Sequence, residues 1–525
     1  MKPGCLRQTE LPNTSPLFAD LVYHFDRVAP FYEYCHLDKA SYARAAAKLQ
    51  FPDSRRHALV AALREQNAPS GELDRLAQPG TVAVVTGQQV GLFSGPCYTI
   101  YKALTAARLT EQLNAQGIPA VTIFWLATED HDFDEINHAW VFDAAKQPHG
   151  LCVDSPVGDH TPVGGIQVPQ YPVEQLRAAL SGHPFGGEIA AMVEQSYQPG
   201  QTLGRAFADL LKLLLPNLGL LFLDPMAPPV RSLAAPLMRE AVSGAGLLTE
   251  KLLERNLQLE QAGYHAQVHV EARTSLFFLL ENGTRQTLRR DGDVYANGKK
   301  RYAAAELAAR AEHLSPNALL RPVVQDYLLP TVAQIGGPAE LAYLAQSQVI
   351  YHTLGQPAPV VLPRNGFTLL DARAVKLIER YLLAHHDFFG GLDGLRSRIS
   401  ESLVPPSLKE KLTSAHRQAE QLLDSLQGEL TGFDATLGQA ARKSRAKILY
   451  QLSKIEAKTA RQSIRRDQRA GAEADYLFHL IYPNKHLQER LYTILPFLAQ
   501  HGPGVIDTIR ESVHLDCPDH IILGL

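Results

Sequence analysis

Two short apolar runs, separated by one helical segment, limit the possible fold of this chain most strongly. The runs are 81–86 (T-V-A-V-V-T) and Ala120–Leu126 (A-V-T-I-F-W-L), and neither alternates polar with apolar residues. Such continuous runs are typical of strands buried on both faces. Residues 98–113, between them, carry apolar side chains at helical spacing. A strand, a helix and a strand in this order predict a parallel sheet and an α/β fold, with further strands at 218–223 and 360–362.

Residues 274–302 have a different pattern, because three turn dipeptides separate short strand-like runs. The dipeptides are Asn282-Gly283, Asp291-Gly292 and Asn297-Gly298. Hairpin turns favour such pairs, so we predict a β-meander inserted in the α/β core. A helix is predicted over 337–354, where Pro338 stands in the first turn and Gly355 follows the end.

From Leu408 to about Arg469 the apolar residues recur in steps of four and three, which is typical of a coiled coil. They are Leu408, Leu412, Ala415, Ala419, Leu422, Leu426, Leu430, Phe433 and Leu437, followed by Ile448, Leu452, Ile455 and Thr459. Gly428, Gly432 and Gly438 indicate a turn, so we expect an antiparallel helical hairpin; two ordinary core helices are the alternative. The apolar seam predicts a homodimer. We expect a core over 1–390, the hairpin over 391–470, and a C-terminal segment, 471–525, that returns to the core.

Composition narrows the class of partner. The 525 residues contain 51 Lys and Arg against 54 Asp and Glu, a net charge of −3, so no nucleic-acid partner is expected. The most apolar stretch, 210–223, is interrupted by Lys212 and Pro216, and we expect no membrane span. Five scattered cysteines without a C-x-x-C pair indicate neither a disulfide framework nor a zinc site. With no apolar leader at the N-terminus, a cytoplasmic protein is expected.

The first candidate site is a glycine-rich loop, 87–96, that follows the first predicted strand. It contains Gly87, Gln88, Gln89, Gly91 and Gly95. Glycines let a backbone approach a ligand closely, and the amides that begin a helix attract anions. The loop has no P-loop pattern, and a simple tight turn is the alternative.

The second candidate is the acidic stretch after the second predicted strand. Glu129, Asp130, His131 and Asp132 lead it, and Asp134 and Glu135 follow. Crowded carboxylates repel one another, so their clustering favours a bound cation, an ammonium group or an acid–base role. We expect the first four to be catalytic, and His131 and Asp132 to face Gln88 and Gln89. A solvated acidic loop is the alternative. No recognised metal-ligand pattern is present, and no metal is predicted.

The third candidate, 334–340, repeats the pattern of the first, with Gly336 and Gly337 before a helix that begins with Pro338. Glu340 could complement the helix dipole, and Arg364 with Asn365, after another strand, could add a cation. Two such loops in one α/β core favour a composite pocket. A basic patch, 442–469, could touch phosphates, but pairing with acidic residues of the other hairpin helix is the favoured use.

Four segments resemble motifs of the bacillithiol-biosynthesis cysteine-adding family, BshC. They are V-V-T-G-Q-Q-V-G-L-F-S-G-P-C-Y-T-I-Y-K-A-L (84–104), F-W-L-A-T-E-D-H-D-F-D-E-I-N-H (124–138), V-V-Q-D-Y-L-L-P-T-V-A-Q-I-G-G-P-A-E (323–340) and V-L-P-R-N-G-F-T-L-L (361–370). Their order and spread indicate that the resemblance covers nearly the whole chain. Cys97 stands where the family usually has an apolar residue, and we expect no reactive thiol there.

The resemblance implies a Rossmann-like core related to class I nucleotidyltransferases, with inserted connecting segments and a coiled coil that mediates dimerisation. It implies a ligase that adds L-cysteine to glucosaminyl-malate, with ATP or another nucleotide activating the carboxyl group. The loop 88–96 lacks the His-x-Gly-His tetrad usual in that nucleotidyltransferase class. Substrate-binding residues expected in the four segments are Gly87, Gln88, Gln89, Gly91, Gly95, Tyr98, Asn137, Gln325, Gly336, Gly337, Glu340, Arg364 and Asn365.

A second nucleotide-contact region is expected over 482–490, where cations and an aromatic face could hold phosphate and base. Its candidates are Tyr482, Asn484, Lys485, Gln488 and Arg490. A basic loop at the edge of the core is the alternative. Two other functions stay open: a metal-dependent hydrolase using His131, Asp132 and Asp134, and a non-enzymatic coiled-coil scaffold.

Overall fold

The computed structural model describes residues 4–525, which divide into two compact units. The larger unit comprises residues 4–368, 489–523 and 525, and the smaller unit comprises residues 369–488 and 524. The expected borders at 390 and 470 therefore both lie within the smaller unit. Within the described residues, every helix is too short or too polar to cross a membrane.

The larger unit contains a five-stranded parallel sheet in the order β14-β13-β2-β3-β6. The strands are β2 (Val82–Gln88), β3 (Ala120–Leu126), β6 (Leu220–Leu223), β13 (Thr331–Gly336) and β14 (Val360–Pro363). The register places Gly87 opposite Trp125 and Gln88 opposite Leu126. The parallel sheet predicted from the two apolar runs is confirmed, and β2 and β3 are direct neighbours. The strand β13, which is the other neighbour of β2, was not predicted.

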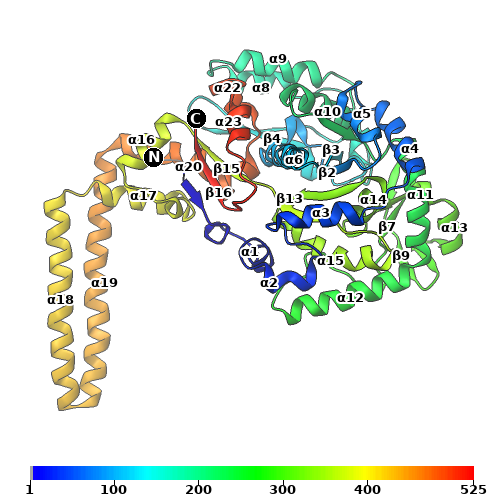
Figure 1. Cartoon of the computed structure of the whole chain (residues 1–525). Helices are drawn as coiled ribbons and strands as arrows, with labels where there is room; N and C mark the ends of the chain where they lie inside the picture. The colour runs from blue at the N-terminus through cyan, green and yellow to red at the C-terminus, as the bar shows by residue number, and fades with distance from the viewer. Residues whose placement is uncertain (1–3) are drawn as a thin grey trace. The chain divides into compact units, whose positions relative to one another are not determined.

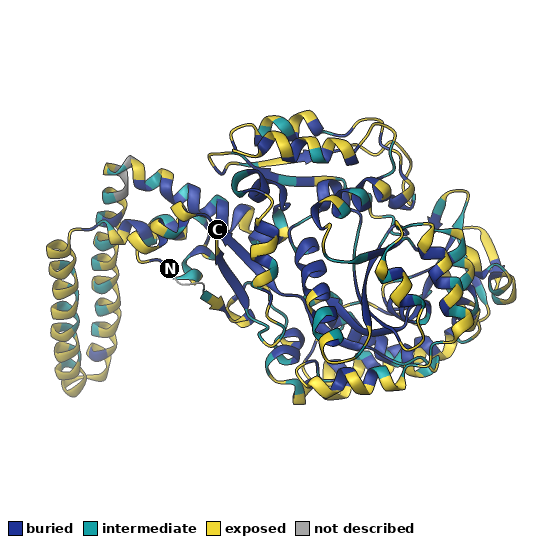
Figure 2. Cartoon of the chain, turned by 45° about the horizontal axis from the view of Figure 1, so that its top comes forward, coloured by how far each residue is buried: buried dark blue, intermediate teal, exposed yellow. Residues whose placement is uncertain are grey.

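Both faces of this sheet are buried, which explains why its strands lack alternation. Val82 and Val84 pack in one apolar cluster with α3 (Lys39–Lys48) and α6 (Tyr98–Ala115). Ala83 and Val85 point to the opposite cluster, formed with other helices of the larger unit. Those helices include α4 (Asp53–Arg64), α5 (Gly71–Ala77), α11 (Pro228–Ser243), α12 (Ala245–Gln261), α14 (Arg321–Leu328) and α15 (Pro338–Thr353). Figure 1 shows the helices around the strands, and Figure 2 shows the strands as buried.

The predicted insertion folds as hairpins, but it forms two small sheets rather than one meander. One has the order β12-β7-β8 and the other the order β11-β10-β9. The strands are β7 (Phe277–Glu281), β8 (Thr284–Gln286), β9 (Arg289–Asp291), β10 (Val294–Asn297), β11 (Lys300–Ala303) and β12 (Leu314–Pro316). All three turn glycines have positive φ, as the dipeptides require: Gly283 (75°), Gly292 (61°) and Gly298 (56°). The insertion brings β7 and β8 to the site described below.

Short elements complete the larger unit. The strands are β1 (Gly4–Leu6), β4 (His138–Phe142), β5 (Pro148–Cys152), β15 (Gly366–Leu370), which crosses the border between the units, and β16 (His520–Gly524). The helices are α1 (Pro16–Tyr23), α2 (Phe25–Val28), α7 (Phe133–Ile136), α8 (Val173–Leu180), α9 (Gly186–Ser196), α10 (Leu203–Leu214), α13 (Ala304–Ala309), α21 (Gln488–Leu491), whose first residue belongs to the smaller unit, α22 (Leu495–His501) and α23 (Val505–Glu511).

The smaller unit is helical and contains the predicted antiparallel hairpin. Its two long helices, α18 (Pro406–Phe433) and α19 (Ala435–Arg466), run side by side and turn at Asp434, as Figure 1 shows. The predicted acid–base pairing across the hairpin is present at Arg445, which contacts Glu420 at 2.8 Å and Asp424 at 2.6 Å. The other helices are α16 (Ala372–Arg380), α17 (Gly391–Ser402) and α20 (Gln468–Ile481).

The apolar residues of the hairpin divide into two sets. Leu412, Ala419, Leu430, Leu452 and Thr459 are half-buried in the seam between α18 and α19. The other set is an outer stripe of exposed residues, on helices that Figure 2 shows as largely exposed. This outer stripe consists of Leu408, Leu422, Leu426 and Phe433 on α18 and Leu437, Ile448 and Ile455 on α19. Leu422 is 70% exposed and Phe433 is 84% exposed, so the hairpin alone leaves the stripe without cover.

The pairing of β2 with β3 predicts a steric requirement for glycine at position 87. A Cβ atom there would lie 2.8 Å from the backbone oxygen of Trp125 and 2.9 Å from its Cβ. Gly87→Ala should therefore lower the free energy of unfolding by about 1–3 kcal/mol, measured by urea denaturation. Gly187→Ala, in α9, is the matched control, because a Cβ atom at that position would meet nothing within 4 Å. Equal stability of the two variants would contradict this packing.

Candidate active site

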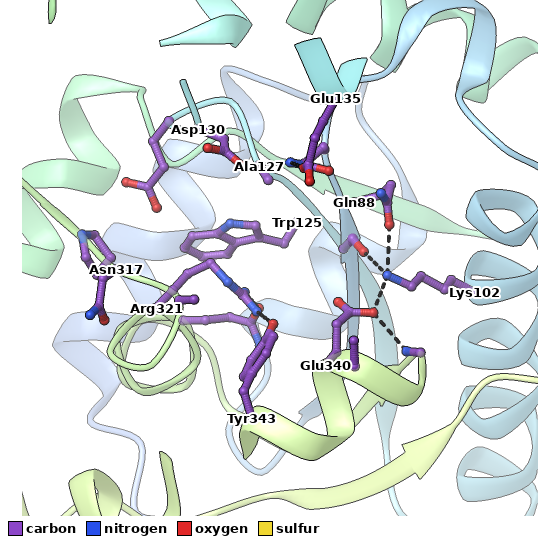
Figure 3. A pocket seen from close by; sticks show the side chains of 18 of the residues that line it. Gln88, Lys102, Trp125, Ala127, Asp130, Glu135, Asn317, Arg321, Glu340 and Tyr343 are labelled. Atoms are coloured by element: carbon purple, nitrogen blue, oxygen red, sulfur yellow. Dashed lines mark hydrogen bonds and ion pairs between the residues drawn. The ribbon is translucent and has the colours of Figure 1, made fainter. Parts of the chain in front are cut away.

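A cavity of about 590 Å³ lies at the carboxyl ends of β2, β3 and β13 in the larger unit. This is the edge at which open α/β sheets bind ligands. The cavity is lined by residues from the three strand ends, from α6, α14 and α15, and from the hairpins of the insertion. Figure 3 shows Asp130 and Glu135 on one side of it and Lys102, Glu340, Arg321 and Tyr343 on the other.

Glu129 carries a buried carboxylate next to the cavity, directly after β3. Its Oε2 accepts a hydrogen bond of 2.8 Å from Ser315 and lies 4.0 Å from Nη1 of Arg231. Its Oε1 is buried and has no hydrogen-bond partner in the described structure. A buried carboxylate oxygen without a donor is costly, so this atom is suited to receive a donor from a ligand.

Gln89 donates hydrogen bonds that offset the repulsion between carboxylates of the acidic stretch. Its side-chain Nε2 donates to Asp130 Oδ2 at 2.8 Å and to Glu135 Oε2 at 2.5 Å. One amide group thus joins two carboxylates that line the cavity, and it connects the end of β2 to the loop after β3. The expectation that the two strand-end loops share one crevice is confirmed by these contacts.

His131 lies beside Arg285 of β8. The two side chains meet at 3.1 Å, between Nδ1 of the imidazole and Nη1 of the guanidinium. Burial and the Arg285 charge both lower the pKa of His131 below its ordinary value, so the ring is neutral at pH 7. Because arginine only donates, Nδ1 must accept, and the ring proton must be on Nε2. His131 is therefore arranged as a hydrogen-bond donor rather than as a proton acceptor.

Lys102 of α6 supplies a cation that is already neutralised. Its Nζ donates to Gly87 O at 3.0 Å and to Gln88 Oε1 at 2.8 Å, and it pairs with Glu340 Oε2 at 2.5 Å. Burial raises the pKa of Glu340, but the Lys102 ammonium outweighs burial and keeps that pKa below its ordinary value. Glu340 also accepts from the Gly337 N–H at 2.8 Å, which caps α15.

Arg364 is also neutralised, whereas two other arginines of the cavity are not. Arg364 binds both carboxylate oxygens of Glu489, at 2.9 and 2.6 Å. Within the described residues, neither Arg321 nor Arg490 has a carboxylate within 4.0 Å. Arg490 stands over the Tyr98 ring, with 5.8 Å between its Cζ and the ring centroid. The cavity therefore offers positive charge to an anionic ligand.

The structure brings together many of the predicted site residues. Those that line the cavity are Gly87, Gln88, Gln89, Tyr98, Glu129, Asp130, His131, Gln325, Gly337, Glu340, Arg364 and Arg490. Gly91 and Gly95 instead line a neighbouring cavity of about 70 Å³, together with Gln88, Gln89 and Tyr98. The roles of all these residues in binding and catalysis stay predictions.

Other predicted residues do not line the main cavity. Asp132 is exposed and caps α7 by accepting from the Glu135 N–H at 3.4 Å. Asn137 ends α7, and Gly336 ends β13. Asn365 is buried and binds the backbone of His514 and Cys517. Tyr482, Asn484, Lys485 and Gln488 belong to the smaller unit, where Gln488 is buried and binds the backbone of Leu369 and Leu480.

Several lining residues were not predicted from the sequence, and four of them have side chains that the site's hydrogen bonds use. These four are Lys102, Arg285, Arg321 and Tyr343. Lys102 could have been noticed only because it is a lysine within the otherwise apolar face of the helix over 98–113. Arg285 lies in the insertion, to which no site role was assigned. Within the described residues, no group of three or more His, Cys, Asp or Glu side chains is placed to hold a metal ion.

Comparison with known proteins identifies the family. Residues 5–365 match the N-terminal Rossmann-like domain of bacillithiol biosynthesis BshC, and residues 367–525 match its C-terminal coiled-coil domain. Three similar proteins carry the name "Putative cysteine ligase BshC". The protein of Solibacter usitatus is 53% identical over 519 residues, which are 99% of each chain. That of Koribacter versatilis is 34% identical over all of both chains (100%), and that of Salinibacter ruber is 31% identical over 97% of this chain and 96% of its own. The chain therefore belongs to the BshC family of bacillithiol biosynthesis.

Proposed function

We propose that this chain is a cysteine ligase that joins the carboxyl group of L-cysteine to the amino group of glucosaminyl-malate. The names of its relatives and the resemblance of its four motifs support the ligase activity and the two substrates. The cavity at the carboxyl edge of the sheet is the proposed site of the reaction.

The proposal rests on the presence in one cavity of carboxylates that follow β3 and of arginines that have no described carboxylate partner. Glu129, Asp130 and Glu135 can bind the ammonium groups of the two substrates. Arg321 and Arg490 have no carboxylate partner and can bind the anionic groups. Both substrates carry an amine and at least one carboxylate, so one cavity with both charges fits them.

The proposed chemistry needs a base for the incoming amine. An ammonium ion has no lone pair, so the glucosaminyl nitrogen must lose a proton before it attacks the activated acyl carbon of cysteine. The nitrogen–carbon bond then forms, and the bond from that carbon to the leaving phosphate oxygen breaks. Oε1 of Glu129 is the proposed proton acceptor, because it is buried and has no donor. The Nε2–H of His131 is the proposed donor to a substrate oxygen.

ATP is the proposed source of activation, because a free carboxylate is a poor acyl donor. Bound ATP would supply a phosphate or adenylate leaving group to the cysteine carboxyl. Arg321 and Arg490 fit the phosphate charge, and the amides at the start of α15 lie at the same edge. We also propose that the reaction takes place in the cytoplasm, where thiols are kept reduced.

We further propose that the outer stripe of α18 and α19 binds a second copy of this chain. The stripe residues are apolar and exposed, and along α18 they are separated by fourteen, four and seven residues, which keeps them on one face of the helix. A second hairpin would cover them with the same pattern, as in coiled coils.

Ligation by wild-type protein should be detectable by mass spectrometry with cysteine, glucosaminyl-malate and ATP, and Glu129→Gln should lower turnover at least ~100-fold. Asp134→Asn is the matched control, because this carboxylate belongs to the same stretch but is exposed and does not line the cavity. His131→Asn should also lower turnover, and Asp132→Asn should lower it less, since Asp132 lies outside the lining.

Unchanged turnover in Glu129→Gln would contradict the base assignment. A wild-type protein that forms no product with any nucleotide would contradict the ligase itself. Release of AMP or of ADP, measured in the same reaction, distinguishes the adenylate route from the phosphate route.

Dimerisation should depend on the outer stripe. Leu422→Glu combined with Ile448→Glu places charges in the stripe, so light scattering should give the monomer mass at concentrations where the wild type is a dimer. Gln421→Glu is the control, because this residue of α18 is exposed but does not belong to the outer stripe. A double variant that stays dimeric would place the interface elsewhere.

A further inference from the structure

Arg321 has more donors than the protein uses. It begins α14, and its guanidinium lines the cavity. Nη1 donates to Gln325 Oε1 at 2.9 Å, and Nη2 donates to Tyr343 Oη at 2.9 Å. A guanidinium has five N–H groups, so these two bonds leave three without a described protein acceptor. Both acceptors are neutral, and a guanidinium paired only with neutral groups beside a cavity is suited to an anion.

The orientation of Gln325 decides what Arg321 contacts. Gln325 is 1% exposed, and its Nε2 donates to Asp326 Oδ1 at 3.0 Å. The carboxylate of Asp326 can only accept, and the guanidinium of Arg321 can only donate. A single orientation of the amide satisfies both, with nitrogen toward Asp326 and oxygen toward Arg321. Asp326 thereby determines that an oxygen faces the guanidinium.

Asp326 is itself held in place. It is 6% exposed, and its Oδ2 accepts a hydrogen bond from the hydroxyl of Tyr351 on α15. A buried hydrogen-bonded series therefore runs from Tyr351 through Asp326 and Gln325 to Arg321 and ends at Tyr343. Arg321 and Gln325 are four residues apart on α14, so they share one face of the helix. The two end residues of this hydrogen-bonded series, Tyr351 and Tyr343, both belong to α15.

We propose that Arg321 binds a carboxylate of the malyl group of glucosaminyl-malate, and that Asp326 is a positioning residue that acts through Gln325. This inference rests on the proposed function, since it names the part of the substrate that an arginine without a described carboxylate partner holds. A phosphate oxygen of a nucleotide has the same hydrogen-bonding chemistry, so the experiment must separate the two anions. Asp326 does not line the cavity, and a direct contact with substrate is not part of its role.

The test is isothermal titration of the full-length protein with three probes: glucosaminyl-malate, L-malate and inorganic phosphate. Arg321→Gln should weaken binding of both malyl compounds about 10- to 100-fold, the range for a hydrogen-bonded charge. Asp326→Asn should weaken it by about tenfold, because an asparagine can donate and no longer fixes the Gln325 amide. The double variant should bind no more weakly than Arg321→Gln alone, since Asp326 acts only through Arg321.

Asp20→Asn is the control for a general loss of stability. Asp20 is a half-buried carboxylate bound to Arg27 and Tyr264, and it does not line the cavity. Malyl binding that is unchanged in both Arg321→Gln and Asp326→Asn would overturn the inference and leave the ligase proposal intact. Additive effects in the double variant would overturn the positioning role. Arg321-dependent binding of phosphate without binding of malate would overturn the carboxylate assignment, and a wild type that binds none of the probes would overturn both proposals.

Discussion

The ammonium group of Lys102 joins three segments that together form the floor of the cavity. It contacts the end of β2 at Gly87 and Gln88, and it pairs with Glu340 in the first turn of α15. All three ammonium protons thus have acceptors, which offsets the cost of burying the charge. Because Glu340 also caps α15 through Gly337, this ion pair sets where α15 begins relative to the sheet. Tyr343 and Tyr351 follow on the same helix, and they form the two ends of the hydrogen-bonded series that contains Arg321.

The parallel pairing of the strands places polar side chains from distant segments of the sequence at the carboxyl edge of the sheet. The loops after β2 and β3 meet because those strands are neighbours in register, and β13 adds α15 on the other side of β2. The insertion then contributes Arg285, which orients His131 and lies 3.6 Å from Asp130. The carboxylates Glu129, Asp130 and Glu135 all follow β3, with Arg285 of the insertion beside them, while the arginines without a described carboxylate partner come from α14 and α21.

The central sheet and the hairpin could be predicted because their signals are local: β3 follows its apolar run, and the helices of the hairpin follow the 4-3 spacing. The strand β13 was missed because its last residues, up to Gly336, were interpreted as part of a glycine loop. For the site, the strand-end residues were found from topology, whereas Arg321 and Lys102 were not. Their roles depend on tertiary contacts with Tyr343 and Glu340, which no local spacing reveals. Likewise, the sequence alone could not predict which apolar residues of the hairpin lie in the seam and which form the outer stripe, because that depends on how α18 and α19 pack.

In the proposed arrangement, one cavity at the carboxyl edge of the sheet holds both substrates, with amines toward Glu129 and carboxylates toward Arg321. The most direct measurement is a crystal structure of the protein with glucosaminyl-malate, cysteine and a non-hydrolysable ATP analogue. We expect density for the substrates inside the cavity, with the glucosaminyl nitrogen within hydrogen-bond distance of Glu129 Oε1 and a malyl carboxylate on Arg321. Substrates bound at another surface, with the cavity filled only by water, would contradict this arrangement.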